Sequence, residues 1–130
     1  MHLLLDTHIL LWAAADSPRL PQQARDLLLD PDYQLAYSVT SLWEITIKRG
    51  LDRSDFRVDV EPSVLRRELL EHGYEELAIR GAHALAVGSL PDLHKDPFDR
   101  MLIAQAGVEG YTLLTSDHQL AQYPGPIRTV

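Results

Sequence analysis

The sequence predicts an α/β fold in which a parallel β-sheet is covered by helices on both faces. Two observations lead to this prediction. Short apolar segments alternate along the chain with segments that have the spacing of helices, and Pro or Gly stands near many of the boundaries between them. Because parallel strands need long crossover connections, which helices supply, strands that alternate with helices indicate a parallel sheet.

The first half of the chain has several clear element boundaries. The first apolar run stops at Asp6, and a helical pattern follows at once. Pro21 suits the first position of a helix, and Gly50 suits a helix end. Either Thr40 or Ser41 can open the helix before Gly50. We therefore expect strands at 2–5 and 34–38, helices at 7–15, 21–29 and 40–50, and at 51–60 a solvent-exposed connecting loop that is a candidate substrate contact.

The second half continues the same alternation. Gly73 closes one helix, and the pair Asp96-Pro97 provides the N-cap and the first residue of another, which ends near Gly110. Residues 91–95 have no regular pattern. The expected helices are at 62–72, at 82–87, at 97–108 and in a short turn after Ser116, and the expected strands are at 75–79, 111–114 and 127–129.

The composition fits one packed domain over residues 1–130. Of the 130 residues 45% are hydrophobic and 24% charged, as in globular domains that bury a core. The absence of cysteine excludes disulfides and thiolate zinc sites, so any metal must be held by oxygen or imidazole. The longest apolar run, Ile9 to Ala15, is much shorter than the roughly 20 residues of a membrane helix, and no Lys or Arg precedes Arg19 as a signal peptide would require. We expect a cytoplasmic protein without a membrane segment.

The net charge argues against a nucleic-acid ligand unless cations are bound. Twelve Lys and Arg against nineteen Asp and Glu give a formal charge of −7, which repels a polyanion. Two divalent cations held by four of the acids would change this charge to about −3. The basic residues are also clustered, at Lys48, Arg49, Arg53 and Arg57 and again at Arg66 and Arg67.

Four acidic residues stand at the ends of predicted strands or early in the helices after them. They are Asp6, Glu44, Asp99 and Asp117. Because functional groups of parallel α/β sheets gather at the carboxyl ends of the strands, we expect these carboxylates to lie close together. Two carboxylates about 4 Å apart repel by roughly 4 kcal/mol at an effective dielectric near 20, so such a cluster requires cations. Oxygen ligands select Mg²⁺ or Mn²⁺, which also bind phosphate oxygens. The pattern predicts a metal-dependent nuclease site.

Helix capping is the competing explanation for each acid. An acid in the first turn of a helix interacts favourably with free N–H groups and with the helix dipole, and Ser41 to Glu44 matches a capping box. Each helix start nevertheless has another capping candidate, namely Thr7, Thr40 or Ser41, Asp96, and Thr115 or Ser116. We therefore expect the acids to be redundant as caps.

Four short motifs resemble, in sequence, order and spacing, those of the PIN-domain family. They are Leu4-Leu5-Asp6-Thr7-His8, Ser41-Leu42-Trp43-Glu44-Ile45, Asp96-Pro97-Phe98-Asp99-Arg100 and Leu114-Thr115-Ser116-Asp117. Within this family the chain looks like a VapC-type toxin, and the resemblance extends from Leu3 to the final strand. Four motifs in order are much more specific than any one of them.

The resemblance implies a five-stranded parallel sheet in the order 3-2-1-4-5, a Mg²⁺ or Mn²⁺ site, and endonucleolytic cleavage of RNA. It also implies a cognate VapB-like antitoxin and a homodimer. Matched by position, the metal-binding and catalytic acids are Asp6, Glu44, Asp99 and Asp117, and Thr115 is the hydroxyl residue that orients ligands near them. Asp96 is the alternative to Asp99. We prefer Asp99, because Asp96 is already explained as the cap before Pro97.

Several other residues invite a functional or a packing interpretation. Lys48, Arg49 and Arg100 share helices with the acids and are candidate substrate contacts. The six histidines form no HExxH pair, so packing or exposure is expected for most of them. Trp12 and Trp43 have aliphatic neighbours on helical faces, and we expect both to pack in the core.

Other functions stay open at this point. One is a DNA nuclease on the same fold, because nothing in the sequence reads the 2′-hydroxyl and only the resemblance favours RNA. Another is a nuclease in RNA processing without a toxin role, and a third is a non-catalytic module that binds a partner. An aspartyl-phosphate phosphotransferase is disfavoured, because His8 stands where a second acid is expected after Asp6.

Overall fold

The computed structural model describes residues 1–51 and 61–130. Arg53, Arg57 and nearly all of the predicted loop at 51–60 lie outside the described residues. None of the described helices has the length and apolar character that crossing a membrane requires. The strands are β1 His2–Leu5, β2 Gln34–Ser38, β3 Glu75–Leu77, β4 Thr112–Thr115 and β5 Ile127–Thr129. The helices are α1 Thr7–Ala14, α2 Gln22–Leu29, α3 Val39–Arg49, α4 Pro62–Glu71, α5 Gly81–Val87, α6 Pro97–Glu109 and the 3₁₀ helix η1 His118–Gln122.

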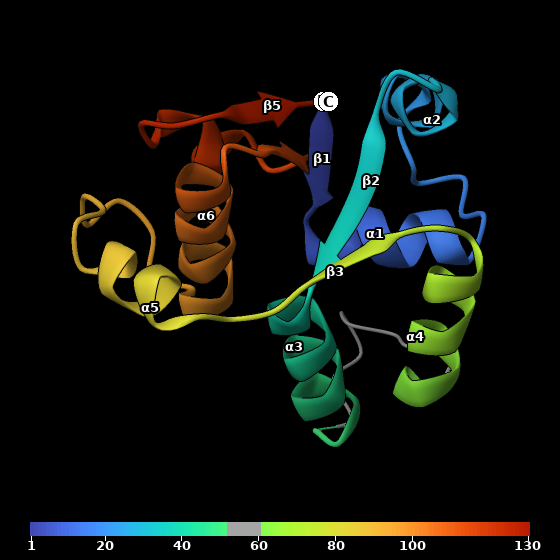
Figure 1. Cartoon of the computed structure of the whole chain (residues 1–130), viewed down its shortest axis with the longest axis horizontal. Helices are drawn as coiled ribbons and strands as arrows, with labels where there is room; N and C mark the ends of the chain where they lie inside the picture. Colours follow the sequence, from blue (N-terminus) through green and yellow to red (C-terminus); the bar gives the residue numbers. More distant parts are fainter. Residues whose placement is uncertain (52–60) are drawn as a thin grey trace.

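The strands form one parallel sheet in the order β3-β2-β1-β4-β5 (Figure 1). β1 pairs in parallel with β2 and β4, which pair in turn with β3 and β5. The expected fold class and strand order are therefore confirmed. Because all the strands run in the same direction, their carboxyl ends share one edge of the sheet, where Asp6 follows β1, and Ser38 and Thr115 end β2 and β4.

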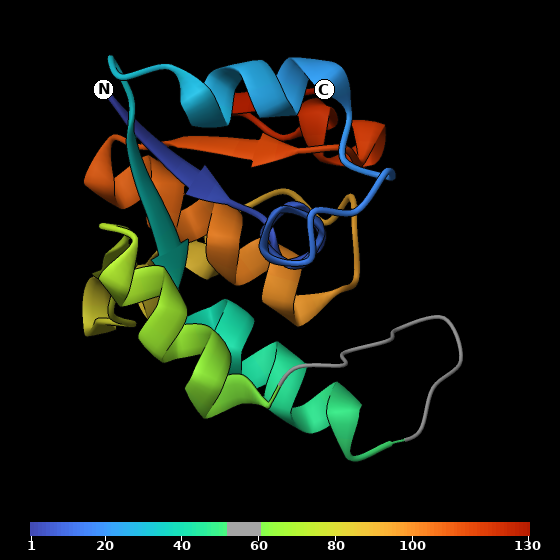
Figure 2. The ribbon, with the colours of Figure 1, turned by 90° about the vertical axis from the view of Figure 1, so that its right-hand side faces the viewer.

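Helices cover both faces of this sheet, as the sequence predicts. α1, α2 and α4 lie on one side, and α5 and α6 lie on the other (Figures 1 and 2). Along β1 successive side chains point to opposite faces, so Leu3 and Leu5 join the core on the α1 side and Leu4 joins the core under α6. These leucines are at most 1% exposed. Burial on both faces holds β1 in place, and this fixes the position of Asp6 at its end.

Helix α3 projects from the carboxyl end of β2 and contacts α1, α4 and α6. Its N-cap is Ser38, whose hydroxyl accepts a hydrogen bond from the Thr40 N–H (2.9 Å), so the helix begins earlier than predicted. The same hydroxyl donates to Oε1 of the buried Gln105 on α6 (2.5 Å). This bond ties the start of α3 to α6. Pro21 is likewise the N-cap of α2 and not its first residue.

The prediction that Trp43 packs in the core is wrong. The residue is 53% exposed, and its ring meets the Phe98 ring edge-on with 5.0 Å between centroids. Ile47, one turn further along α3, is also exposed. The helical spacing correctly groups these two residues on one face, but that face points away from the sheet. Trp12 does pack against the core on the α1 side.

Candidate active site

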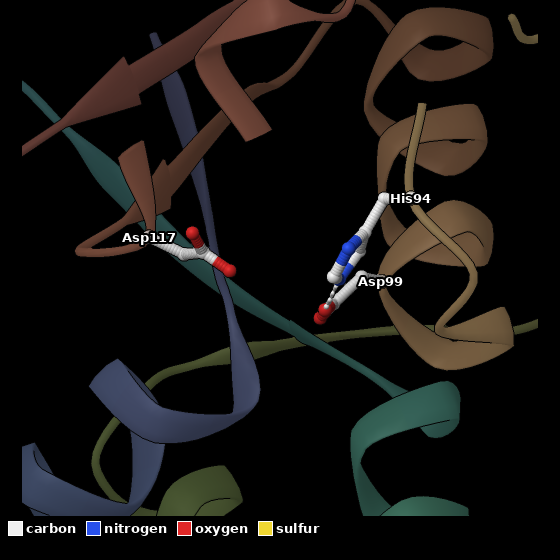
Figure 3. A group of neighbouring side chains, drawn as sticks. All are labelled: His94, Asp99 and Asp117. Atoms are coloured by element: carbon white, nitrogen blue, oxygen red, sulfur yellow. Dashed lines mark hydrogen bonds and ion pairs between the residues drawn. The ribbon is translucent and has the colours of Figure 1, made fainter. Parts of the chain in front are cut away.

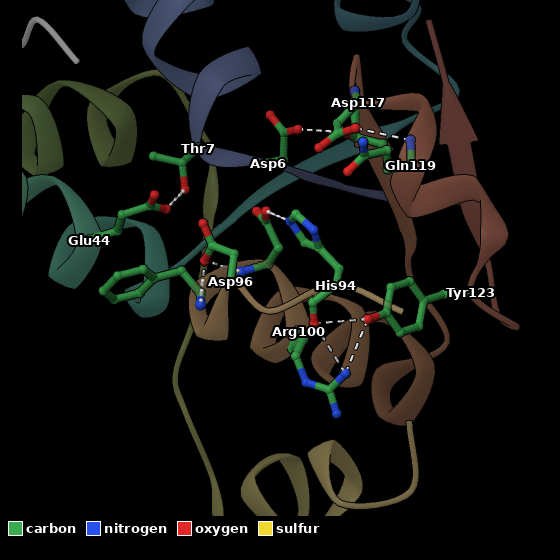
Figure 4. Close-up of polar contacts among 12 residues, drawn as sticks. Asp6, Thr7, Glu44, His94, Asp96, Arg100, Asp117, Gln119 and Tyr123 are labelled. Atoms are coloured by element: carbon green, nitrogen blue, oxygen red, sulfur yellow. Dashed lines mark hydrogen bonds and ion pairs between the residues drawn. The ribbon is translucent and has the colours of Figure 1, made fainter. Parts of the chain in front are cut away.

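Asp6 and Asp117 meet at the carboxyl ends of the neighbouring strands β1 and β4 (Figure 4). Asp6 is 4% exposed, and its Oδ1 accepts a hydrogen bond from the Ile9 N–H (2.8 Å). The hydroxyl of Thr115 donates to Oδ2 of Asp6 and accepts a hydrogen bond from the Asp117 N–H (3.0 Å). Thr115 therefore links the two acids directly.

Glu44 reaches the same region from α3. The residue is 2% exposed, and its Oε1 accepts a hydrogen bond from the Thr7 hydroxyl (2.6 Å). Its Oε2 lies 2.5 Å from Nζ of Lys48, one turn further along α3. Because Thr7 directly follows Asp6, the Thr7 contact places Glu44 beside the end of β1.

Asp99 and Asp96 occupy different positions at the start of α6. Oδ1 of Asp96 accepts hydrogen bonds from the N–H groups of Phe98 (2.9 Å) and Asp99 (3.2 Å), so Asp96 is the N-cap of the helix. Oδ2 of Asp99 instead lies 3.0 Å from Nε2 of His94. Since capping already explains Asp96, the geometry favours Asp99 as the member of the acidic set.

Helix capping explains two of the four acids, Asp6 and Asp117, and does not explain the other two. Asp6 is itself the N-cap of α1, and Asp117 is itself the N-cap of η1, with Oδ1 accepting from the Gln119 N–H (2.9 Å). The expectation that neighbouring residues cap these two helices is therefore wrong. Glu44 lies beyond the first turn of α3 and makes no capping bond to it, and Asp99 is not the cap of α6. For these two acids capping is no explanation.

The acids shift one another's pKa values. Burial raises the pKa of Asp99, the charges of Asp96, Glu44 and Asp6 add to this effect, and the His94 hydrogen bond opposes it, so that the pKa is raised to about 7. Burial also raises the pKa of Asp6, and the charge of Glu44 adds to this effect, while hydrogen bonds from Ile9 and Thr115 oppose it. Negative charge is thus unfavourable at this site, and a bound cation would compensate for it.

The residues present fit a divalent cation. Among the described residues, His94, Asp99 and Asp117 each offer one ligand atom, and these atoms lie within 4.8 Å of one another (Figure 3). Asp6 and Glu44 line the same region (Figure 4). Carboxylate oxygens are the ligands that Mg²⁺ and Mn²⁺ prefer, and imidazole adds a ligand suited to transition metals. The site brings together all four acids that the sequence singles out.

The three basic residues proposed as substrate contacts have different surroundings. Lys48 lies against Glu44, at the edge of the acids, and Arg49 is exposed at the end of α3. The guanidinium of Arg100 donates to the carbonyl oxygens of Val87, Leu90, Pro91 and His94 and to the hydroxyl oxygen of Tyr123. This set of contacts favours a structural role for Arg100, so its contact with substrate stays a prediction that the geometry does not support.

His94 is a residue of the candidate site that the sequence does not single out. The residue lies in the irregular segment between α5 and α6, where no periodicity indicates the direction of a side chain. One signal was present: a histidine stands two positions before the Asp96 cap and therefore close to the first turn of α6. Proximity to Asp117, which lies on another element, depends on the fold and has no local signature.

Three comparisons with known proteins, by family model, by sequence and by structure, give matches that agree. A family model described as PIN domain matches residues 3–126. Ribonuclease VapC22 from Mycobacterium tuberculosis (strain ATCC 25618 / H37Rv) is 28% identical over 123 residues, which are 95% of this chain and 92% of that protein. A chain in the crystal structure of VapBC2 from Rickettsia felis, bound to a DNA fragment from their promoter, has a TM-score of 0.70 at 17% identity, covering 99% of this chain and 98% of that one. A chain of DNA-bound VapBC from Salmonella typhimurium has a TM-score of 0.66 at 18% identity, with the same coverage.

Proposed function

The chain belongs to the PIN domain family, and from this premise we propose that it is a divalent-metal-dependent endoribonuclease and the toxin of a VapBC-type toxin–antitoxin pair. One observation carries the proposal. Four acids from separate parts of the chain lie in one buried or half-buried cluster, and two of them, Glu44 and Asp99, have no capping role. A cluster of this kind is costly in a stable protein unless it binds cations.

In this proposal Asp6, Glu44, Asp99 and Asp117 hold the cation, and none of them attacks the phosphorus. The chemistry that a cation supplies when bound is polarisation of the phosphate and a lower pKa for the attacking water. Thr115 keeps the carboxylate of Asp6 in one orientation by donating to its Oδ2. Thr7 does the same for Glu44. Such supporting hydrogen bonds orient ligands and sustain metal affinity.

Substrate contact is proposed for Lys48 and Arg49 at the end of α3. Lys48 places a positive charge at the edge of the acids, and Arg49 is exposed on the next position. Positive charge at the edge of the site compensates in part for the net charge of −7, which disfavours RNA binding. The preference for RNA over DNA is supported by the similarity to a protein named a ribonuclease.

Cleavage of a single-stranded RNA by the purified full chain tests the proposal. The assay compares RNA with DNA of the same sequence, each with Mg²⁺, with Mn²⁺ and with EDTA. We expect cleavage of RNA with metal, and a loss of at least about 100-fold in Asp6→Asn, because its charge and its fixed ligand position are removed. The matched control is Asp32→Asn, the same change at an exposed residue at the opposite end of β2, which is expected to cleave as the unchanged protein does.

The outcomes separate the alternatives. Equal cleavage of DNA would remove the restriction to RNA. Full activity in EDTA or in Asp6→Asn would overturn the proposed site. Saturable Mn²⁺ binding that is lost in Glu44→Gln would support the enzyme, whereas no binding to the unchanged chain up to millimolar Mn²⁺ would support a non-catalytic binding module. Circular dichroism of each variant verifies that the fold is retained.

The toxin role has its own test in bacterial cells. Expression of the chain is expected to arrest growth and to produce new RNA ends, and expression of Asp6→Asn is expected to do neither. Co-expression of a VapB-like protein encoded beside this chain's gene is expected to restore growth. Normal growth during expression of the soluble chain would contradict the toxin role without affecting the nuclease proposal.

We also propose that the domain at 1–130 acts in the cytoplasm as a homodimer. Three exposed apolar side chains on and beside α3, those of Trp43, Ile47 and Leu51, offer apolar area for contact with another protein chain. Sedimentation velocity of the purified chain tests this. A monomer at all concentrations up to about 100 μM, where weak dimers already form, would contradict the dimer.

A further inference from the structure

We propose that Nε2 of His94 is a direct ligand of the divalent cation, together with the carboxylates of Asp99 and Asp117, and that this nitrogen makes the site prefer Mn²⁺ to Mg²⁺. The inference rests on the proposed function, because it concerns the same metal site. It goes further in adding a ligand outside the four acids and in selecting among cations.

The distances fit ligands of one cation. Nε2 of His94 lies 3.0 Å from Oδ2 of Asp99. Adjacent ligands of an octahedral ion with bonds of about 2.1 Å are about 3.0 Å apart. Asp117 offers its ligand atom within 4.8 Å of both, from the opposite side of the site (Figure 3). A cation bound here would replace the present contact between the imidazole and the carboxylate without moving either residue far.

The backbone at residue 94 is held by the elements that carry the other two ligands. Arg100, next to Asp99 on α6, donates to the Tyr123 hydroxyl oxygen (3.1 Å) and to the Pro91 carbonyl (2.9 Å). Tyr123 follows η1, which Asp117 caps, and its hydroxyl donates to the carbonyl of His94 (3.3 Å; Figure 4). Residues 91–94 are thereby attached to both elements although they have no regular structure. Such attachment is typical of a ligand held in position by its surroundings.

The surroundings of His94 also differ from those of a surface ion pair. The side chains of His94 and Asp99 are 23% and 21% exposed, so both are largely removed from water. Mg²⁺ in proteins takes oxygen ligands, whereas imidazole suits first-row transition metals. A nitrogen ligand therefore shifts the preference away from Mg²⁺ towards Mn²⁺.

Pulsed electron paramagnetic resonance of bound Mn²⁺ tests the ligand directly, without an activity measurement. The metal-free full chain is loaded with Mn²⁺, and the ¹⁴N coupling of a bound imidazole is recorded. We expect this coupling in the unchanged protein, its replacement by a ¹⁵N coupling after labelling with [¹⁵N]histidine, and its absence in His94→Gln. The control is His118→Gln, at an exposed histidine directly after Asp117, in which the coupling is expected to persist.

Calorimetric titration tests the preference. In His94→Gln the Kd for Mn²⁺ is expected to rise about 10-fold or more, while the Kd for Mg²⁺ changes by less than about 3-fold. His94→Asn is measured in parallel, so that the inference can still be tested with one variant if the other does not fold. Bound Mn²⁺ without nitrogen coupling in the unchanged protein, or coupling that persists in both His94 variants, overturns this inference alone. Failure of the unchanged protein to bind Mn²⁺ overturns the proposed function as well.

Discussion

Replacing Asp99 with Asn is expected to stabilise the metal-free protein at pH 8, although it removes a residue of the proposed active site. The carboxylate is largely buried and lies near the charges of Asp96, Glu44 and Asp6. Asn has nearly the same size and can still accept a hydrogen bond from His94. The substitution therefore removes the charge and leaves most of the packing.

The expected magnitude follows from the pKa of Asp99. The folded protein raises this pKa from an ordinary value of 3.8 to about 7. The folded state binds the proton of Asp99 more tightly than the unfolded state does. Below about pH 4 the group is protonated in both states and does not reduce the free energy of unfolding. As the pH rises from about 4 towards 7, the free energy of unfolding falls. At 1.36 kcal/mol for each pH unit, the loss reaches about 4 kcal/mol above pH 7, of which about 3 kcal/mol appears between pH 5 and pH 8.

Urea denaturation at pH 5 and pH 8 in EDTA measures this difference. The advantage of Asp99→Asn over the unchanged protein is expected to grow by about 3 kcal/mol between the two pH values, which corresponds to about 10 °C in Tm for a domain of this size. Asp32→Asn is the control and is expected to follow the pH dependence of the unchanged protein. Mn²⁺ at about 100 times its Kd should then add about 2.7 kcal/mol to the unchanged protein and much less to Asp99→Asn.

If the stability advantage of Asp99→Asn over the unchanged protein grows by less than about 1 kcal/mol between pH 5 and pH 8, the reasoning is refuted. The carboxylate would then not be destabilised in the folded state, and the cluster would not require a cation. If the pH dependence is as expected but Mn²⁺ stabilises both proteins equally, Asp99 belongs to the electrostatic cluster and not to the metal site.

The remaining predictions concern the scaffold around the site. Tyr37→Phe is expected to cost about 2 kcal/mol of unfolding free energy, since the hydroxyl of this buried residue donates to the charged Glu76 (2.7 Å); an unchanged urea midpoint would contradict this. Leu113→Ala is expected to cost about 3 kcal/mol, because Leu113 is fully buried in β4; calorimetry measures this, and a loss below about 1 kcal/mol would show that the site collapses around the cavity. Gly110→Ala is expected to cost about 1 kcal/mol in thermal denaturation, since φ is +72° where α6 ends, and Gly107→Ala, inside the same helix, is the control that should not be destabilised.

Local sequence patterns were sufficient to predict those features of the structure that depend on neighbouring residues in the chain. The prediction that Asp96 caps α6 needed only Pro97, because a proline at the first helical position identifies the residue before it as the cap. The alternation of strands and helices was equally visible, since each parallel strand must be followed by a crossover. The strand order came from resemblance to a family and not from periodicity.

The features that could not be predicted from the sequence depend on contacts between distant parts of the chain. The Thr115 hydroxyl of β4 holds the carboxylate of Asp6 at the end of β1, a contact that the apolar run at 2–5 does not encode. Trp43 shares a helical face with Ile47, but the spacing cannot say whether that face meets the sheet. The imidazole of His94 reaches the acids from an irregular segment. In each case the deciding information is the position of another element in space.

The hydroxyl of Thr115 joins Asp6 to the far end of the chain, since the two residues are 109 positions apart. A ribosome makes the polypeptide from its N-terminus, so Asp6 and Glu44 emerge long before β4, which must pair with β1 to complete the site. Pairing over so long a separation is also slow, because the intervening chain has to be ordered first. A growing or prematurely terminated polypeptide that stops before Thr115 therefore lacks the cluster, and the proposed nuclease gains its RNA-cleaving activity only after β4 has been made and has paired with β1.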